Sequence, residues 1–155
     1  MCLASAVWNS QPSALYLAGN TTSIGGHTYD GSVREVNPGT GSTGWATGLG
    51  CEVLGTPALD AATGVLAVAT WAAPCRNGSP AVYLLNAATG SILGTLPINV
   101  GGFAQPVFAG PYLLVADESG QVVAYTPAAA ARHARCTGWC NTRHRQMRAP
   151  PIPAP

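Results

Sequence analysis

Cysteine and histidine side chains come together in one short segment near the C-terminus, where they could form a zinc site. The spacing His133-x2-Cys136-x3-Cys140-x3-His144 supplies thiolate and imidazole groups, which are donors that zinc prefers. These donors occupy only twelve residues, with no second hairpin or helix to shape a tetrahedron around the ion. We therefore interpret the segment as a disordered extension and assign no metal ligand in the chain.

A histidine and an aspartate also lie close together in a glycine-rich loop. His27 and Asp30 fall within Gly25-Gly26-His27-Thr28-Tyr29-Asp30-Gly31, and an imidazole beside a carboxylate could act as a general base. Such a loop is more simply interpreted as a solvated turn, and the acids Asp60 and Glu118 lie at expected hairpins. The sequence therefore predicts no catalytic residue.

The composition restricts the fold before any motif is considered. Charged residues make up 8% of the 155 residues, against roughly 25% in an ordinary soluble domain. The chain also contains 19 glycines and 13 prolines, which leave little room for long regular helices. A solvated helical bundle, a coiled coil and charge-driven disorder are therefore excluded.

The charges are unevenly distributed along the chain. Residues 1–131 carry two arginines against six acids, a net charge of −4, whereas residues 132–155 carry five arginines and no acid. Arginines beside Trp139 could bind single-stranded nucleic acid or an anionic surface. We instead expect residues 128–155 to be a disordered Arg/Pro-rich tail, with no nucleic-acid partner.

Targeting signals are not visible in the chain. The first 19 residues lack a basic segment followed by an uninterrupted apolar one, so no signal peptide is predicted. Every apolar run falls far short of the roughly 20 residues that span a bilayer, so no transmembrane segment is expected.

A repeat of about 49 residues organises most of the chain. Asn37-Pro38-Gly39-Thr40-Gly41 recurs as Asn86-Ala87-Ala88-Thr89-Gly90, an offset of 49. The apolar runs that begin at Leu15, Leu66 and Leu113 keep nearly the same spacing. Repetition at one period indicates a repeat architecture.

The pattern of apolar and turn-forming residues within one period is typical of short antiparallel strands. Residues 65–71 and 112–116 are apolar and bounded by turn formers, as in strands that are buried on both faces. Residues 33–37 and 81–86 each lead into an Asn-x-x-Thr-Gly turn. In such a turn the Asn side chain accepts hydrogen bonds from backbone amides and the Gly adopts a positive φ. A pair of such turns in each period predicts blades of about four strands, arranged radially as a β-propeller.

The run from Glu35 to Trp45 resembles the tryptophan-docking motif of the quinoprotein, or pyrroloquinoline-quinone (PQQ)-like, propeller repeats. In that motif Asp/Asn-x-x-Thr-Gly is followed by a tryptophan four residues after the glycine. The residues that match are Asn37, Thr40, Gly41 and Trp45, and then Asn86, Thr89 and Gly90. The second copy has Gly94 in place of the tryptophan, and the third loses Thr-Gly altogether. The resemblance implies that Trp45 packs over the turn of a neighbouring blade.

The resemblance covers residues 11–127, which we separate from an N-terminal segment, residues 1–10. These 117 positions make about 2.4 periods, whereas closed propellers need at least four blades. We therefore expect a partial all-β propeller that belongs to a longer protein. Alternatives are a ring closed by self-association and a small open β-domain capped by its own tail.

The resemblance implies two functional classes. One is a non-catalytic module that binds an unknown protein or small-molecule ligand, as in assembly-factor lipoproteins with this repeat. The other is a fragment of a PQQ-dependent alcohol or sugar dehydrogenase, an oxidoreductase whose catalytic blades lie elsewhere. The family's enzymes hold a quinone with calcium near a catalytic Asp, and many contain a disulfide between adjacent cysteines. No Cys-Cys pair and no transferable set of calcium ligands occurs here, so we expect no cofactor and favour the binding module.

Cys51 and Cys75 are placed for a structural role. A hairpin from Pro57 to Trp71 would return both cysteines to the same end of a sheet, as a disulfide or as a pair of buried thiols. A bridge would close a 25-residue loop and contribute about 3 kcal/mol. It would also indicate a secreted or periplasmic location.

Overall fold

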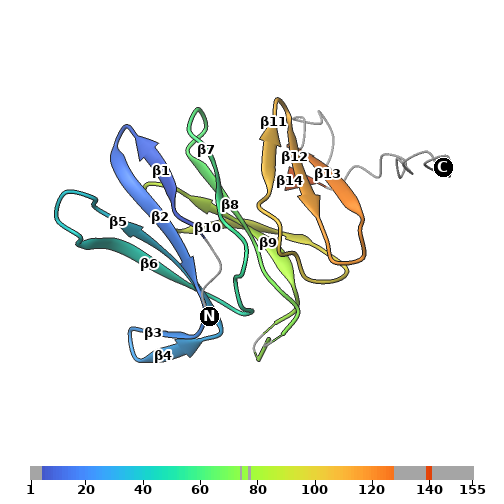
Figure 1. Cartoon of the computed structure of the whole chain (residues 1–155), viewed down its shortest axis with the longest axis horizontal. Helices are drawn as coiled ribbons and strands as arrows, with labels where there is room; N and C mark the ends of the chain where they lie inside the picture. The colour runs from blue at the N-terminus through green and yellow to red at the C-terminus, as the bar shows by residue number, and fades with distance from the viewer. Residues whose placement is uncertain (1–4, 74, 77, 128–138, 141–155) are drawn as a thin grey trace, which may run out of the picture.

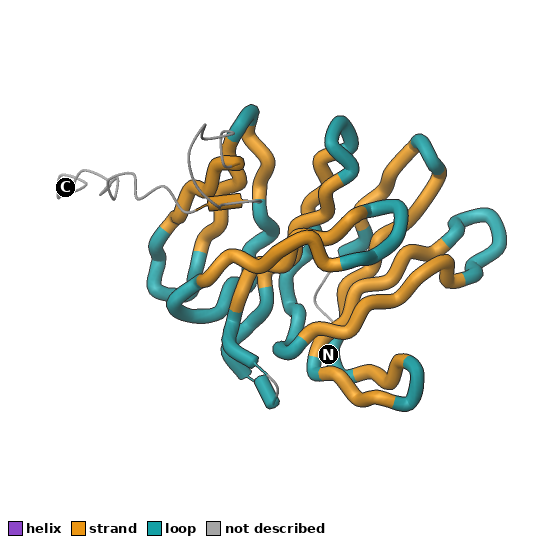
Figure 2. Tube along the Cα trace, turned by 180° about the vertical axis from the view of Figure 1, so that it is seen from behind, coloured by secondary structure: helices purple, strands orange, loops and turns teal. Residues whose placement is uncertain are grey.

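The chain folds entirely into strands and loops over the residues that can be described (Figure 1, Figure 2). The computed structural model describes residues 5–73, 75–76, 78–127 and 139–140. Within these ranges no helix is long and apolar enough to cross a membrane.

Three four-stranded antiparallel sheets make up most of the described residues, and we refer to them as blades 1, 2 and 3. Blade 1 contains β1 (Val7–Ser10), β2 (Ser13–Gly19), β5 (Gly31–Val36) and β6 (Thr43–Leu49). Blade 2 contains β7 (Ala58–Asp60), β8 (Val65–Ala69), β9 (Ala81–Asn86) and β10 (Ile92–Pro97). Blade 3 contains β11 (Val107–Ala109), β12 (Tyr112–Ala116), β13 (Val122–Pro127) and β14 (Trp139–Cys140).

Each blade is an up-and-down meander in which successive strands pair antiparallel. In blade 2, for example, Ala58 on β7 pairs with Ala67 on β8, and Ala67 in turn pairs with Leu84 on β9. The first strand of blade 2 lies against the first strands of blades 1 and 3. The three sheets thus radiate from a common line of inner strands, as propeller blades do (Figure 1).

The blades extend beyond the repeat boundaries expected from sequence. β1 lies within residues 1–10 and pairs along its whole length with β2. The sequence does not predict this strand, because its polar residues Asn9 and Ser10 are typical of a turn. β14 lies within the tail and pairs with the end of β13. Three blades are therefore present where 2.4 periods were counted, and the other tail residues lie outside the described ranges.

A small hairpin is inserted in blade 1 between β2 and β5. It contains β3 (Thr22–Ile24) and β4 (His27–Tyr29), and both strands lie near β6. The Arg34 guanidinium on β5 donates a hydrogen bond to the Thr22 hydroxyl, with Nη2 and Oγ1 2.6 Å apart. The Tyr29 ring lies over Gly48, where any side chain would overlap it. The hairpin is therefore folded back onto its own blade.

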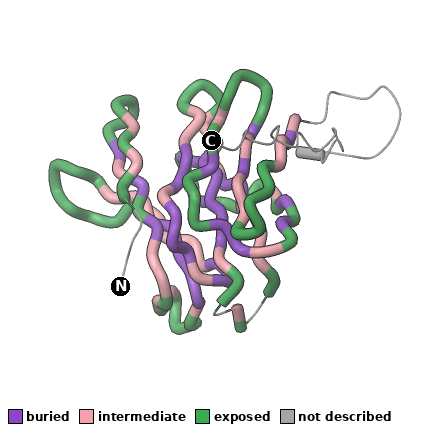
Figure 3. The backbone as a smooth tube through the Cα atoms, turned by 45° about the vertical axis from the view of Figure 1, so that its right-hand side comes forward, coloured by how far each residue is buried: buried purple, intermediate pink, exposed green. Residues whose placement is uncertain are grey.

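The middle blade is buried on both of its faces, and Figure 3 shows buried segments gathered where the sheets meet. Leu66 and Val68 on β8 join the core shared with blade 1. The alternate residues Ala67 and Ala69 join the core shared with blade 3. Strand periodicity sends successive side chains to opposite faces, so an uninterrupted apolar strand serves two interfaces.

Tyr125 ties blade 3 to blade 2. Its side chain is 1% exposed, and its hydroxyl donates a hydrogen bond to the Pro97 carbonyl oxygen at 2.5 Å. Burial raises the pKa of this phenol above its ordinary value of 10.0, and the nearby Asp117 carboxylate raises it further. The folded chain therefore retains the phenol proton at a pH where the unfolded chain loses it.

The free energy of unfolding should accordingly fall as the pH rises above about 10, because ionisation of Tyr125 then stabilises the unfolded state but not the folded one. Tyr125→Phe is expected to lower the free energy of unfolding at pH 7 by about 1 kcal/mol, through loss of the hydrogen bond. It should also flatten the alkaline decline. Urea denaturation at pH 7 and 10.5 measures both effects, with the exposed Tyr112→Phe as control. An alkaline decline of the same size in Tyr125→Phe would contradict the assignment.

Candidate functional site

The two Asn-x-x-Thr-Gly turns have the same geometry, residues 37–41 in blade 1 and residues 86–90 in blade 2. The closing amide donates to the Asn carbonyl at 2.7 Å in the first turn and 2.8 Å in the second. In both turns the Asn Oδ1 accepts hydrogen bonds from the amides two and three residues later, at 2.9 and 3.2 Å. Gly41 and Gly90 adopt φ values of 71° and 72°. The shared sequence therefore encodes the same turn geometry in both blades.

Trp45 of blade 1 packs over the 86–90 turn of blade 2. Its indole N–H donates a hydrogen bond to the Ala87 carbonyl oxygen at 3.1 Å, and Thr47 Oγ1 donates to the Gly90 carbonyl oxygen at 2.6 Å. A methyl group at Gly90 would overlap the indole ring. The Tyr16 ring lies behind the indole, with 5.9 Å between the ring centroids. Trp45 thus occupies the place between blades that the resemblance implies.

The contact between blades 2 and 3 uses a different side chain. Gly94 stands at the position that corresponds to Trp45, and nothing in the described structure lies within 4 Å of a side chain built there. The hydrogen bond from Tyr125 to Pro97 links these two blades instead. At this interface the donor therefore belongs to blade 3 and the acceptor to blade 2. Between blades 1 and 2 the order is reversed, because Trp45 of blade 1 donates to blade 2.

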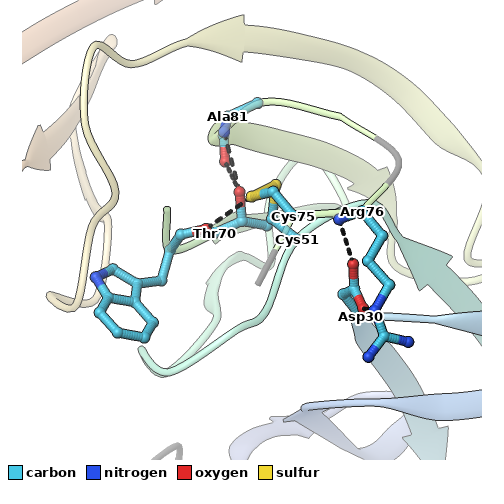
Figure 4. Close-up of a disulfide and its surroundings, with 7 residues drawn as sticks. Asp30, Cys51, Thr70, Cys75, Arg76 and Ala81 are labelled. Atoms are coloured by element: carbon cyan, nitrogen blue, oxygen red, sulfur yellow. Dashed lines mark hydrogen bonds and ion pairs between the residues drawn. A yellow bond between two sulfur atoms is a disulfide. The ribbon is translucent and has the colours of Figure 1, made fainter. Parts of the chain in front are cut away.

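A disulfide and an ion pair between Asp30 and Arg76 lie together at one end of the blades (Figure 4). Cys51, between β6 and β7, is bonded to Cys75, between β8 and β9. The next backbone amide, that of Arg76, donates to Asp30 Oδ2 at 2.6 Å, and the Arg76 Nε lies 3.4 Å from Asp30 Oδ1. Asp30 is 2% exposed, whereas the Arg76 side chain is 66% exposed. These contacts hold the long loop of blade 2 against blade 1.

The described structure does not bring together the residues that the sequence offered as a general base or as metal ligands. Asp30 faces Arg76, and no hydrogen bond or ion pair among the described residues joins it to His27 on the inserted hairpin. The described part of the chain contains no group of three or more His, Cys, Asp or Glu side chains that could hold a metal ion. His133, Cys136 and His144 lie outside the described residues, and Cys140 is described only as backbone in β14.

Several contacts at this end were missed by sequence reasoning. Arg76 could have been noticed, since only two arginines occur in residues 1–131 and this one follows a cysteine. The Trp71 and Phe103 rings pack with centroids 5.1 Å apart, on loops that no periodic pattern links. Tyr125 lies in the degenerate third copy of the motif, at the position where the first two copies have Val36 and Leu85. Contacts between loops of different blades leave no local signal in the sequence.

The asymmetry of the Asp30–Arg76 contact can be tested by substitution. Asp30→Ala removes the buried carboxylate that accepts the Arg76 amide, so we expect a loss of about 1–3 kcal/mol in the free energy of unfolding. Arg76→Ala keeps that amide and removes a largely exposed guanidinium, so its cost should stay below about 1 kcal/mol. Chemical denaturation of both variants measures the difference. Equal costs would show that the guanidinium, and not the amide, holds the loop.

The docking of Trp45 can be separated from backbone strain with two glycines of equal φ. Gly41→Ala places a methyl group in the left-handed region without a neighbour, at a cost of about 1–2 kcal/mol. Gly90→Ala carries the same strain and also displaces the indole, which adds about 1–3 kcal/mol. Thermal or urea denaturation compares them. If both variants lose the same stability, Trp45 does not hold the blades together.

Comparison with known proteins identifies the fold. No family model and no curated protein matches the sequence. Among solved structures, the crystal structure of BamB from Moraxella catarrhalis is similar, with a TM-score of 0.61 and 15% identity over 79% of this chain. A europium-containing methanol dehydrogenase is similar over the same share of the chain, with a TM-score of 0.52 and 14% identity.

This chain spans 31% of the length of the first of these structures and 24% of the second. At such identities the likeness is one of fold. Together with the three blades and the Trp45 contact, it confirms the prediction from the turn motif: this chain has the fold of the quinoprotein-like, or PQQ-like, β-propeller repeats.

Proposed function

We propose that this chain is a non-catalytic module of a longer propeller protein, which serves as a binding or scaffold surface. The observation that carries the proposal is the exposure of large apolar side chains on the two outer blades, at the faces turned away from the middle blade. Contiguous exposed apolar surface on a folded protein marks an interaction site.

The open face of blade 3 is defined by Val107, Tyr112, Leu114 and Val122. Val107 pairs with Leu114 across β11 and β12, and these residues alternate with Leu113 and Val115, which are buried against blade 2. Val122 is 67% exposed, and Val107 and Tyr112 are also exposed. These four positions carry no charge. A further blade or an apolar partner surface would cover them as blade 3 covers blade 2.

Three of the six acids in the described structure, all of them aspartates, are engaged in structural contacts. Asp30 accepts the Arg76 amide, and the carboxylates of Asp60 and Asp117 accept hydrogen bonds within their own hairpin turns. These residues therefore do not fit the oxygen-rich set that calcium requires, and no quinone-assisted step is derived from them. This supports a binding role over the alternative, a fragment of a PQQ-dependent dehydrogenase.

The Cys51–Cys75 bridge supports an extracytoplasmic location, because disulfides persist in oxidising compartments. The partner would be a protein or a small molecule that contacts the open faces or the loops at the end of the blades. Further blades of the same propeller are the simplest covering for the faces themselves, since closed propellers have at least four.

A pair of charge substitutions tests the exposed face. Val107→Lys combined with Val122→Lys should reduce binding of an uncharged apolar dye such as Nile red, because charge on the face opposes apolar contact. Leu93→Lys is the matched control, since Leu93 is 54% exposed on β10 but lies on neither outer blade. Dye fluorescence is measured at equal concentrations of folded protein.

Equal dye binding in all three proteins would contradict a binding role for the blade 3 face. The non-catalytic part of the proposal has its own test, reconstitution with calcium and PQQ followed by dye-coupled oxidation of alcohols or sugars. Turnover in that assay would favour the dehydrogenase alternative.

A further inference from the structure

Blade 3 lacks most of the fourth strand that completes the other two blades. In blade 1 the fourth strand, β6, pairs with β5, and in blade 2 β10 pairs with β9, in both cases along most of the strand. β14 is two residues long and pairs with β13 at Thr126 and Pro127. Among the described residues, no strand pairs with the outer edge of β13 from Val122 to Tyr125. Backbone amide and carbonyl groups on this edge therefore have no partner strand in the described structure.

The outer edge of β13 also lacks the features that usually protect an edge strand. Native edges commonly carry a charge, a proline or a bulge that discourages further pairing. In blades 1 and 2 the register of the outermost pair of strands shifts once. β10 also ends in Pro97, and the inserted hairpin lies near β6. Residues 122–125 are Val-Val-Ala-Tyr, and their pairing with β12 is regular. This stretch of edge is therefore open to a further strand.

The most exposed large apolar side chain of the described residues lies on this edge. Val122 is 67% exposed and faces the open side of the blade, opposite Ala116 of β12. In blade 2 the equivalent row runs from Ala69 through Val82 to Leu96 of the fourth strand. Leu96 is 3% exposed. A fourth strand on β13 would therefore place an apolar side chain beside Val122, as Leu96 lies beside Val82.

We propose that the outer edge of β13, from Val122 to Tyr125, accepts an extended segment of a partner polypeptide as an added antiparallel strand. The segment is uncharged and has apolar side chains at alternate positions, one of which lies beside Val122 on the open face. Main-chain hydrogen bonds supply the affinity, and the alternate side chains supply the specificity. The inference rests on the proposed function and deepens it, because it names the class of partner and the way in which it binds.

The chain's own sequence offers a poorer strand for this edge. Counted in the register of β14, the residues that would stand opposite Val122 and Val123 are His144 and Arg143. Both are polar, whereas blade 2 has Leu96 at the first of these positions. An imidazole would leave Val122 without apolar cover. A partner segment with an apolar residue at that position meets no such mismatch.

The test uses a synthetic peptide with the sequence of residues 90–97, which contains the fourth strand of blade 2. A fluorophore at its N-terminus allows binding to the full chain to be followed by fluorescence anisotropy. Two further peptides carry backbone N-methyl groups, one at Leu93 and Thr95 and the other at Gly94 and Leu96. Strand addition uses the amide donors on one edge of the peptide, so one methylated peptide should bind like the parent and the other about tenfold more weakly. Equal weakening by both patterns would contradict strand addition.

Two protein variants locate the bound peptide. Val122→Lys should weaken binding of the parent peptide about tenfold, because the apolar contact at the edge is lost. Val107→Lys is the matched control, since it places the same charge on the same face but on β11, two strands from the edge. Equal losses in both variants would show that the peptide lies across the face, which overturns strand addition but not the proposed function. Absence of peptide binding also overturns the inference, while Nile red binding reports separately on the face.

Amide hydrogen exchange of the full chain distinguishes the partner segment from the other occupants. Amides of residues 122–125 that point away from β12 should exchange rapidly in the free chain and become protected when the peptide is added. Protection in the free monomer would identify the chain's own tail as the occupant. Protection that appears only as the protein concentration rises, together with a dimer by light scattering, would identify a second copy. Either result would overturn the inference.

Discussion

A four-stranded blade whose two faces are both apolar cannot be stable alone, and the rest of this structure depends on that constraint. β8 is Val-Leu-Ala-Val-Ala, so each successive side chain must be covered from the opposite side. Blades 1 and 3 provide that cover, which leaves Leu66, Val68 and Ala67 fully buried. The scarcity of charged residues follows, because few strand positions in such an arrangement remain in water.

The two interfaces meet this constraint with different polar contacts. Trp45 of blade 1 donates a hydrogen bond to the Ala87 carbonyl oxygen of blade 2, whereas Tyr125 of blade 3 donates one to the Pro97 carbonyl oxygen of blade 2. Both side chains are aromatic, with a large apolar body and one donor, which suits a contact that is packed along its sides and polar at its tip. The interface between blades 2 and 3 therefore has a hydrogen bond between the blades even though position 94 is a glycine.

The fold could be predicted from the sequence because the turn motif and the apolar runs recur at one period. Asn37, Gly41, Asn86 and Gly90 shape turns whose geometry is local, so short-range chemistry suffices to identify them. β1 was missed because its four residues are half polar. The Asp30–Arg76 contact joins residues 46 apart in sequence through a loop whose path depends on the folded blades, and no periodicity reports such a contact.

The central claim is that each blade depends on its neighbours for cover, and native-state hydrogen exchange tests it most directly. Amides of β8 and β9 should exchange only through global unfolding, because both faces of blade 2 are covered. Amides of β2 and β12 should exchange through smaller openings, because each outer blade has one open face. Equal exchange free energies across all three blades would contradict the account.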